Sequence, residues 1–435
     1  MKQIGLYTLF FLVLNPMNAQ LDKAKLDHYF DVLEQNQKFN GGVALSENGK
    51  IIYERSLGYA DFGSQKKINS ETKFRIGSIS KTFTAVLIMK MVDEGKMDIY
   101  KKLCVYLPDL KNCSEITVEQ LMNHHSGIFN FTNDPDYLNW NTKAKSRKEL
   151  LDMINTYESV FDPGSKAEYS NSNYVLLTLV LEKTYGKPYE EILQEKIIRP
   201  LDLKNTFIGG TINLEKNEAY SYKKLYQWEM EPETDMSIPL GAGAVISTPH
   251  DIIKFGEALF GGKIISETSL NNMKIIKDGY GFGLFEFPFY EKKALGHTGG
   301  IDGFSSMWGY FANEKVSIAI TSNGSDINNN DIAVVLLSAV FNQPYEIPTF
   351  AKPNADAVPG YTGIFSNSQI GMKITVTESD GQFFAQATGQ SAFPLEKASD
   401  FQFKFAPAGI VMEFAEDLKS FTLLQGGGKF VFFKE

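Results

Sequence analysis

Residues 74–95 read FRIGSISKTFTAVLIMKMVDEG, and the interpretation of the whole chain starts from this stretch. Its long apolar run, Phe83 to Val92, favours a buried helix, and Gly95 stands where a helix C-cap is expected. Ser78 and Lys81 lie just before that run and three positions apart, so in a helix they share one face. The serine hydroxyl would then lie beside the lysine amine, at the positive end of the helix dipole.

The S-x-x-K spacing has two interpretations. The chain contains four such pairs, and three lie in polar, turn-rich surroundings typical of solvated surface: Ser64/Lys67, Ser70/Lys73 and Ser221/Lys224. In the fourth, burial would disfavour the ammonium form of Lys81, and a neutral amine beside a hydroxyl is a general base beside a nucleophile. Alternatively, Ser78 is a helix N-cap and Lys81 extends its amine to solvent. The segment alone leaves both interpretations open.

The composition is that of an acidic globular protein. The chain has 435 residues, 43% hydrophobic and 22% charged, which is enough for two or three domains. A formal net charge of -9 and a pI near 5.3 provide no basic surface for nucleic acid. The five histidines have neither metalloprotease nor zinc-ribbon spacing, so no metal and no cofactor is expected.

The N-terminus, MKQIGLYTLFFLVLNPMNAQ, follows the pattern of a secretory signal peptide. Lys2 supplies the charged start, Ile4 to Leu14 is mostly apolar, and Ala19 is a small residue after which cleavage is expected. The apolar run is too short to span a bilayer, and no later segment has enough uninterrupted apolar residues to do so. We therefore expect residues 1–19 to be removed and the mature protein to be exported without a membrane span.

The two cysteines, Cys104 and Cys113, flank VYLPDLKN, whose Pro108 suggests a turn that could bring the thiols together. Export would place them in an oxidising compartment, where a disulfide can form. A chain of this length does not need a covalent cross-link, so two free thiols are an equal alternative.

The order of the predicted elements indicates a sheet built from both ends of one domain. An amphipathic helix over residues 21–37 precedes a hairpin, GGVALSENGKIIYERSLGYAD, which turns at Asn48-Gly49. Residues 101–260 are mainly helical in pattern. This order predicts an α/β (α+β) domain with a helical insertion. Strand character returns over residues 294–297, 305–311 and 316–321, and a helix is expected over 331–341.

Beyond this domain the composition changes. Residues 342–361, NQPYEIPTFAKPNADAVPGY, contain four prolines and are typical of a semi-rigid linker. The tail then consists of short strand-like segments such as FQFKF, IVMEF and KFVFF. The expected organisation is a signal peptide over 1–19, a main domain over 20–343, a linker over 344–360 and a small all-β barrel or sandwich over 361–435.

Several motifs resemble, in order, those of the penicillin-recognising serine hydrolases. That superfamily includes class C β-lactamases, D-alanyl-D-alanine carboxypeptidases and related esterases and aminopeptidases. FRIGSISKTFTA resembles its nucleophile segment, and the resemblance spans residues 39–341. It implies a β-lactamase/transpeptidase-like antiparallel sheet flanked by helices, and the tail looks like the small β-domain appended to many such hydrolases. The other similar segments are LMNHHSGI (121–128), FDPGSKAEYSNSNYVLL (161–177), GAGAVISTPHDIIKFGEAL (241–259) and GHTGGIDGFSS (296–306).

The resemblance implies a role for each matching residue. Ser78 would be the nucleophile that forms an acyl-enzyme, and Lys81 would take its proton. Tyr169, with its pKa lowered by the nearby Lys81, would act as a general base and return the proton to the leaving group. Asn171 would hydrogen-bond Lys81 and the substrate amide. The ordinary alternatives are a half-buried aromatic side chain for Tyr169 and a helix N-cap for Asn171.

The last motif departs from the family pattern. Where many members have lysine, threonine and glycine, this chain has His297, Thr298 and Gly299, followed by Gly300. The lysine supplies a fixed positive charge toward the substrate carboxylate, whereas histidine is mostly neutral at neutral pH. If His297 contacts an anionic group, activity on anionic substrates should favour mildly acidic conditions. Thr298 would hydrogen-bond a carboxylate or carbonyl, the backbone N–H groups of Ser78 and Gly300 would form an oxyanion hole, and the two glycines would let substrate approach the strand.

The expected function is that of a secreted serine hydrolase acting through an acyl-enzyme on amide, peptide or ester substrates, with D-amino-acid-containing cell-wall-type peptides favoured. The departure at His297 disfavours efficient β-lactam hydrolysis and strict carboxypeptidase activity. The alternatives are a carboxylesterase or weak β-lactamase, and a non-catalytic protein that holds a peptide or glycan on the same fold. The expected partner is a small-molecule or peptide substrate, not nucleic acid, and the family's usual setting implies the periplasm.

Overall fold

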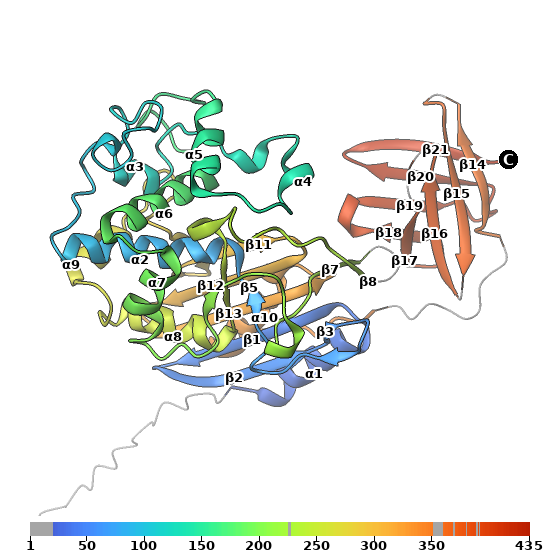
Figure 1. Ribbon diagram of the computed structural model, residues 1–435. Coiled ribbons are helices and arrows are strands. Elements are labelled where there is room, and N and C mark those ends of the chain that lie inside the picture. Colours follow the sequence, from blue (N-terminus) through green and yellow to red (C-terminus); the bar gives the residue numbers. More distant parts are fainter. Residues whose placement is uncertain are drawn as a thin grey trace, which may run out of the picture.

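The computed structural model describes residues 21–224, 228–350 and 360–435, apart from 369, 380, 389 and 391. The predicted signal peptide and the central part of the predicted linker lie outside the described residues. The described chain forms a mixed helical and stranded domain and a C-terminal barrel (Figure 1). The fold class expected from the sequence is therefore confirmed, and of the two expected forms of the tail it is the barrel that occurs.

A six-stranded antiparallel sheet forms the centre of the large domain. The N-terminal hairpin, β1 and β2, joins the sheet by pairing β1 with β13, so the two ends of the domain meet side by side. This is the arrangement that the order of elements predicted. In their order across the sheet, the strands are β10 (Phe285–Phe289), β11 (Lys292–Ile301), β12 (Phe304–Phe311), β13 (Val316–Ser325), β1 (Phe39–Glu47) and β2 (Lys50–Leu57).

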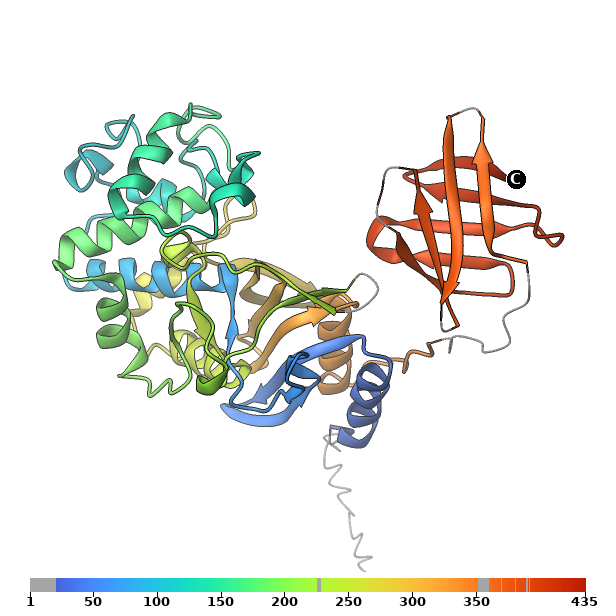
Figure 2. The same ribbon diagram turned by 45° about the vertical axis from the view of Figure 1, so that its right-hand side comes forward.

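Alternating side chains divide this sheet between two apolar cores, because successive residues of a strand face opposite sides. Val43 and Leu45 pack with α1 (Lys23–Gln35) and α10 (Asn329–Val340), which lie side by side in Figure 2. Ala44, between them, belongs to the second core, against which α8 (Pro249–Phe260) packs. Beyond α8 lies α2 (Ser80–Asp93), which is apolar nearly all round because it is buried on most sides.

The helical insertion covers the N-terminal end of α2, where the S-x-x-K segment lies (Figure 1). Its longest helix, α6 (Asn171–Tyr185), ends at Gly186, whose φ of 65° makes it a left-handed C-cap. The insertion also contains strands of two or three residues, which are too short to leave a periodic pattern: β6 (Phe207–Ile208), β7 (Tyr222–Lys224), β8 (Trp228–Met230) and β9 (Val245–Ser247). Cys104 and Cys113 form a disulfide. The helices are α3 (Val118–Met122), α4 (Tyr137–Trp140), α5 (Arg147–Thr156), α6 (Asn171–Tyr185) and α7 (Tyr189–Leu193), with α9 (Glu267–Met273) after α8.

The C-terminal unit is a closed eight-stranded barrel with a core rich in phenylalanine, including Phe365, Phe403 and Phe432. It lies on the side of the large domain where β7 (Tyr222–Lys224) and β8 (Trp228–Met230) project (Figures 1 and 2). Its strands are β14 (Gly363–Asn367), β15 (Met372–Ser379), β16 (Gln382–Ala387), β17 (Phe393–Lys397), β18 (Gln402–Phe405), β19 (Ile410–Phe414), β20 (Ser420–Gln425) and β21 (Gly428–Lys434).

Candidate active site

Ser78 lies in a short 3-10 turn, Gly77–Ile79, that leads directly into α2. The turn is preceded by β5 (Phe74–Arg75), which pairs with β9 (Val245–Ser247). Gly77 has a φ of 48°, and a Cβ at this position would stand 2.7 Å from the backbone nitrogen of Gly300. Only glycine accommodates both conditions without strain. The turn therefore lies directly against β11, with the serine at the contact between helix and sheet.

The Lys81 amine is held inside the protein by three oxygen atoms. The side chain is 0% exposed, and Nζ lies 2.9 Å from Ser78 Oγ, 2.7 Å from Asn171 Oδ1 and 2.7 Å from the carbonyl oxygen of Ala242. Burial lowers the pKa of Lys81 well below its ordinary value, because desolvation penalises the ammonium form. This agrees with the general-base interpretation of the segment and contradicts the alternative in which Lys81 extends to solvent.

The number of hydrogen-bond donors explains how a neutral amine fits this position. A neutral amine has two N–H groups and one lone pair, and two of the three surrounding oxygens are a side-chain amide and a backbone carbonyl that can only accept. When the two N–H groups are donated to Asn171 Oδ1 and the Ala242 carbonyl, the lone pair faces the Ser78 hydroxyl. The amine is then oriented to accept the serine proton.

The Tyr169 hydroxyl donates a hydrogen bond of 2.7 Å to Ser78 Oγ. Its ring stacks obliquely on His124, with 4.6 Å between centroids. Burial raises the pKa of Tyr169 above its ordinary value, so the expectation of a lowered pKa is wrong. The reason is that the buried ring has lost the solvent that would stabilise a phenolate. Tyr169 is therefore a protonated donor to the serine oxygen, and the free base of the cluster is Lys81.

Asn171 is the first residue of α6, directly after the segment that contains Tyr169. Its Oδ1 accepts from Lys81, and its Nδ2 donates to Thr132 Oγ1 at 3.0 Å, which fixes the orientation of the amide. The N-cap of α6 is Ser170, so the alternative of Asn171 as a helix cap is wrong. The structure thus brings together the side chains of Ser78, Lys81, Tyr169 and Asn171, which are separated by up to 93 positions in the sequence.

His297 is the buried member of the β11 segment. Its ring lies 4.4 Å from that of Phe285, between centroids, and its Nδ1 is 2.5 Å from the backbone carbonyl of Thr298. Burial lowers the pKa of His297 to about 3. The histidine is therefore neutral throughout the physiological range. The expectation that His297 favours anionic substrates in mildly acidic conditions is wrong, because its charged form is not populated there.

The two glycines after Thr298 have different roles. A Cβ at Gly299 would stand 2.0 Å from the carbonyl oxygen of Ile76, so this glycine accommodates the backbone before the serine turn and not the substrate. Gly300 is exposed and lines the cavity described below, and Thr298 is exposed on the same strand. Gly300 and Ser78, both predicted from the sequence as site residues, thus line the same cavity.

A cavity of about 660 Å³ opens onto Ser78. Asn171 and Gly300 contribute to its wall, and the other residues that line it were not identified from the sequence. They come from three separate regions, 131–142, 231–243 and 301–302, so no single local pattern could have indicated them. Those of interest below are Phe131, Tyr137, Leu138, Glu231 and Asp302.

Of the two histidines in the LMNHHSGI segment, His124 packs against the ring of Tyr169. His124 has a φ of 61°, and its Nδ1 accepts a hydrogen bond of 3.2 Å from the backbone N–H of Ser170. Burial lowers the pKa of His124 well below its ordinary value, so the ring is a neutral acceptor. His125 is bonded through Nε2 to Asp278 Oδ2 at 2.9 Å. The resemblance of this segment to a family motif was the signal for this role.

The described residues contain neither a metal-binding cluster nor a membrane-spanning helix. Within the described ranges 21–224, 228–350 and 360–435, no group of three or more His, Cys, Asp or Glu side chains is arranged to hold a metal ion. None of the helices in that part of the chain combines the length and the apolar character needed to cross a bilayer.

Comparison with known proteins relates this geometry to a family. A model of the Beta-lactamase family matches residues 26–339. Penicillin-binding protein 4* of Bacillus subtilis is 27% identical over 94% of this chain and 98% of its own length, and teichoic acid D-alanine hydrolase of Staphylococcus aureus is 29% identical over 71% and 75%. The solved structure of a D-stereospecific amidohydrolase from Streptomyces is 28% identical, with a TM-score of 0.62 over 72% of this chain and 98% of its own. Because the family match spans well over half of the chain and includes the serine, lysine and tyrosine described above, the protein is a serine hydrolase that belongs to the Beta-lactamase family.

Proposed function

We propose that this enzyme hydrolyses amide, peptide or ester bonds of D-amino-acid-containing substrates of the cell-wall type through an acyl-enzyme on Ser78. The observation that carries the proposal is the contact of Ser78 Oγ with a buried amine of lowered pKa at 2.9 Å and with a phenol at 2.7 Å. The names of the similar proteins, a D-alanine hydrolase and a D-stereospecific amidohydrolase, support substrates built on D-amino acids. Membership of a serine hydrolase family removes the non-catalytic alternative.

The proposed reaction begins with transfer of the Ser78 hydroxyl proton to the lone pair of Lys81, while Oγ attacks the substrate carbonyl carbon. Asn171 Oδ1 and the Ala242 carbonyl then accept hydrogen bonds from the ammonium that forms. When the tetrahedral intermediate collapses, the bond to the leaving group breaks and the Tyr169 phenol is the donor nearest to protonate it. The Lys81 ammonium, which contacts the same Ser78 oxygen as the phenol, then returns the serine proton to Tyr169, so that both groups regain their starting states. The raised pKa keeps Tyr169 protonated before this step.

The negative oxygen of the intermediate requires donors of its own. The 2.7 Å separation between a Cβ on Gly77 and the backbone nitrogen of Gly300 means that the serine turn and β11 are in direct backbone contact. The N–H groups of Ser78 and Gly300 are our candidates for the oxyanion hole, since both residues line the cavity.

The state of His297 argues against efficient turnover of β-lactams. In family members with lysine at this position, a fixed positive charge faces the carboxylate of the antibiotic. Here burial keeps the side chain neutral, with a pKa lowered to about 3. We therefore place a weak β-lactamase activity second to amide and ester hydrolysis.

Export of the protein is part of the same proposal. The signal-like N-terminus and the disulfide between Cys104 and Cys113 both suit an oxidising compartment outside the cytoplasm. Mass spectrometry of the protein from a periplasmic or culture fraction should find a mature N-terminus at Gln20. An unprocessed Met1 in a cytoplasmic fraction would contradict export without affecting the catalytic proposal.

The catalytic proposal is tested by labelling and by turnover. A fluorophosphonate or a labelled penicillin should modify Ser78, and Ser78→Ala should abolish the label. Ser70→Ala is the matched control, because Ser70 belongs to another S-x-x-K pair and is exposed. A panel of D-alanyl-D-alanine peptides, D-amino acid amides, short esters and nitrocefin identifies the bond cleaved. A label that survives Ser78→Ala would refute the assignment.

A further inference from the structure

The cavity at Ser78 has acidic side chains and no basic ones. Among the described residues that line it there is no lysine, arginine or histidine, whereas Glu231 and Asp302 are both present. The neighbouring Lys81 amine is enclosed by Ser78 Oγ, Asn171 Oδ1 and the Ala242 carbonyl and does not line the cavity. A substrate carboxylate in this cavity therefore meets no cation with which to pair, and carboxylates buried near other carboxylates are disfavoured.

The cation nearest to this acidic wall is already occupied. Arg75 is 1% exposed at its side chain and donates to Asp302 Oδ2 at 2.8 Å and to Glu233 Oε2 at 3.0 Å. Its other contacts are with the backbone carbonyls of Thr234 and Gly210. Two carboxylates thus pair with one guanidinium, and the Asp302 carboxylate is used in this internal ion pair. The charge that remains available to a ligand is that of Glu231.

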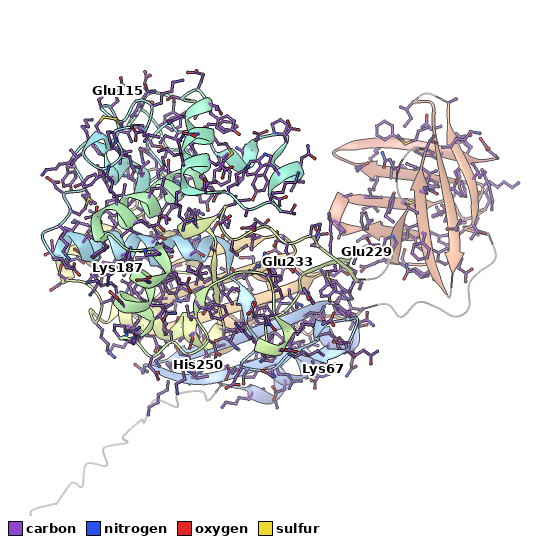
Figure 3. The ribbon with its side chains drawn as sticks, viewed as in Figure 1. Lys67, Glu115, Lys187, Glu229, Glu233 and His250 are labelled. Carbon is purple, nitrogen blue, oxygen red and sulfur yellow. A yellow bond between two sulfur atoms is a disulfide. The ribbon has the colours of Figure 1, made fainter. Side chains whose placement is uncertain are left out.

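A backbone hydrogen bond fixes the position of Glu231, and its side chain is available to bind a ligand. Its N–H donates to the carbonyl of Ser221 at 2.9 Å, and it is followed by Pro232, which also lines the cavity. In the described part of the chain its carboxylate forms no ion pair, unlike that of Glu233. Figure 3 labels Glu229 and Glu233, which flank this position on the segment that crosses from β8 to the body of the domain. Glu229 is exposed and lies outside the cavity wall.

The helical insertion contributes apolar side chains to the cavity beside polar ones. Leu138 on α4 is 79% exposed, which is unusual for a leucine, and it lines the cavity with Tyr137 and Phe131. Exposed apolar groups at a cavity indicate contact with an apolar part of a ligand. The cavity therefore combines a nucleophile, a free carboxylate and an apolar surface.

We propose that Glu231 binds a free ammonium group on the acyl part of the substrate and that Leu138 contacts its apolar side chain. In a peptide or aminoacyl derivative the terminal ammonium precedes the scissile carbonyl, so it belongs to the part that is transferred to Ser78. The preferred substrates are then amides or esters of amino acids with a free amino group, and not peptides recognised by a C-terminal carboxylate. This inference rests on the proposed function of Ser78 as the nucleophile.

The test compares matched substrates that differ only at the amine. We expect the wild-type enzyme to hydrolyse D-phenylalanine 4-nitroanilide with a kcat/KM at least about tenfold above that of its N-acetyl derivative, since a charge-assisted hydrogen bond is worth roughly that factor. Glu231→Gln should remove most of this ratio, chiefly through KM of the amine substrate. Turnover of 4-nitrophenyl butyrate, which carries no amine, is measured alongside to show that Ser78 is active. Glu229→Gln is the control and should retain the wild-type ratio.

The pH dependence gives a second readout, which a purely structural role of Glu231 would not change. The wild-type preference should decrease above pH of about 8, where an α-amino group loses its charge, and Glu231→Gln should show no such decrease. An unchanged ratio in Glu231→Gln, or a wild-type preference for the acetylated substrate, would overturn the ammonium proposal alone. Absence of butyrate ester turnover together with absence of labelling at Ser78 would instead overturn the proposed function and this inference with it.

Discussion

Replacing Lys81 with methionine should separate the catalytic effect of the buried amine from its effect on stability. Burial lowers the pKa of Lys81 in the folded protein, whereas in the unfolded chain the amine has its ordinary pKa of 10.5. Between these two pKa values the unfolded state binds one more proton than the folded state. Wild-type stability therefore rises with pH across this window, by about 1.4 kcal/mol per pH unit, and a methionine does not titrate.

The magnitude follows from this proton count. Between pH 7.5 and 9.5, the unfolding free energy of wild type should increase by about 2.7 kcal/mol relative to Lys81→Met. Compared with wild type, Lys81→Met is thus most stable at pH 7.5, because the free energy needed to keep the buried lysine deprotonated is largest there. Loss of the donor to Asn171 Oδ1 and to the Ala242 carbonyl costs about 1–3 kcal/mol for each group. That cost shifts the whole curve of the variant and leaves the slope unchanged.

The assay is urea denaturation of both proteins at pH 7.5, 8.5 and 9.5, together with turnover of a 4-nitrophenyl ester. Loss of a general base predicts a fall in kcat of about 10²–10⁴-fold for Lys81→Met. Lys90→Met is the control for loss of a lysine from the same helix, since the Lys90 amine donates to the carbonyl of Ile264, away from the cavity, and it should retain turnover. A stability difference between wild type and Lys81→Met that does not vary with pH would mean that the folded amine is charged, and the reasoning would be refuted.

Three other predictions concern the histidine, the serine turn and the disulfide. Because the pKa of His297 is lowered to about 3, the ratio of kcat/KM for an anionic ester to that for a neutral ester should be constant from pH 5 to 8, and an increase toward pH 5 would contradict this. Gly77→Ala should cost about 1–3 kcal/mol of unfolding free energy and lower kcat, because φ is 48° and the new Cβ meets Gly300; unchanged ester kinetics would exclude a role of this contact in catalysis. Cys104→Ser should lower the unfolding free energy by about 2.5 kcal/mol, as expected for a cross-link between residues nine positions apart, and reduced wild type should show the same loss in urea denaturation.

Features that depend on neighbouring residues could be predicted well. The spacing of Ser78 and Lys81 places both side chains on one side of a helix, whatever packs around that helix. Although Ser78 lies in the 3-10 turn before α2, its hydroxyl still lies beside the Lys81 amine. The alternation of Val43, Ala44 and Leu45 assigns each side chain to one face of a strand. The strands of the barrel were visible for the same reason. Such patterns extend over a few residues and need no knowledge of the remaining fold.

The chemistry of the site depends on desolvation, which no short pattern contains. Whether Lys81 is neutral, Tyr169 protonated and His297 uncharged is set by the segments that exclude water from them, and these arrive from distant parts of the chain. The walls of the cavity are a second example, since Leu138 and Glu231 line one cavity only because α4 and the segment after β8 fold over the same serine. Periodicity in the chain thus accounts for the scaffold and the position of the nucleophile, while charge states and substrate-contacting walls arise from packing between segments remote in sequence.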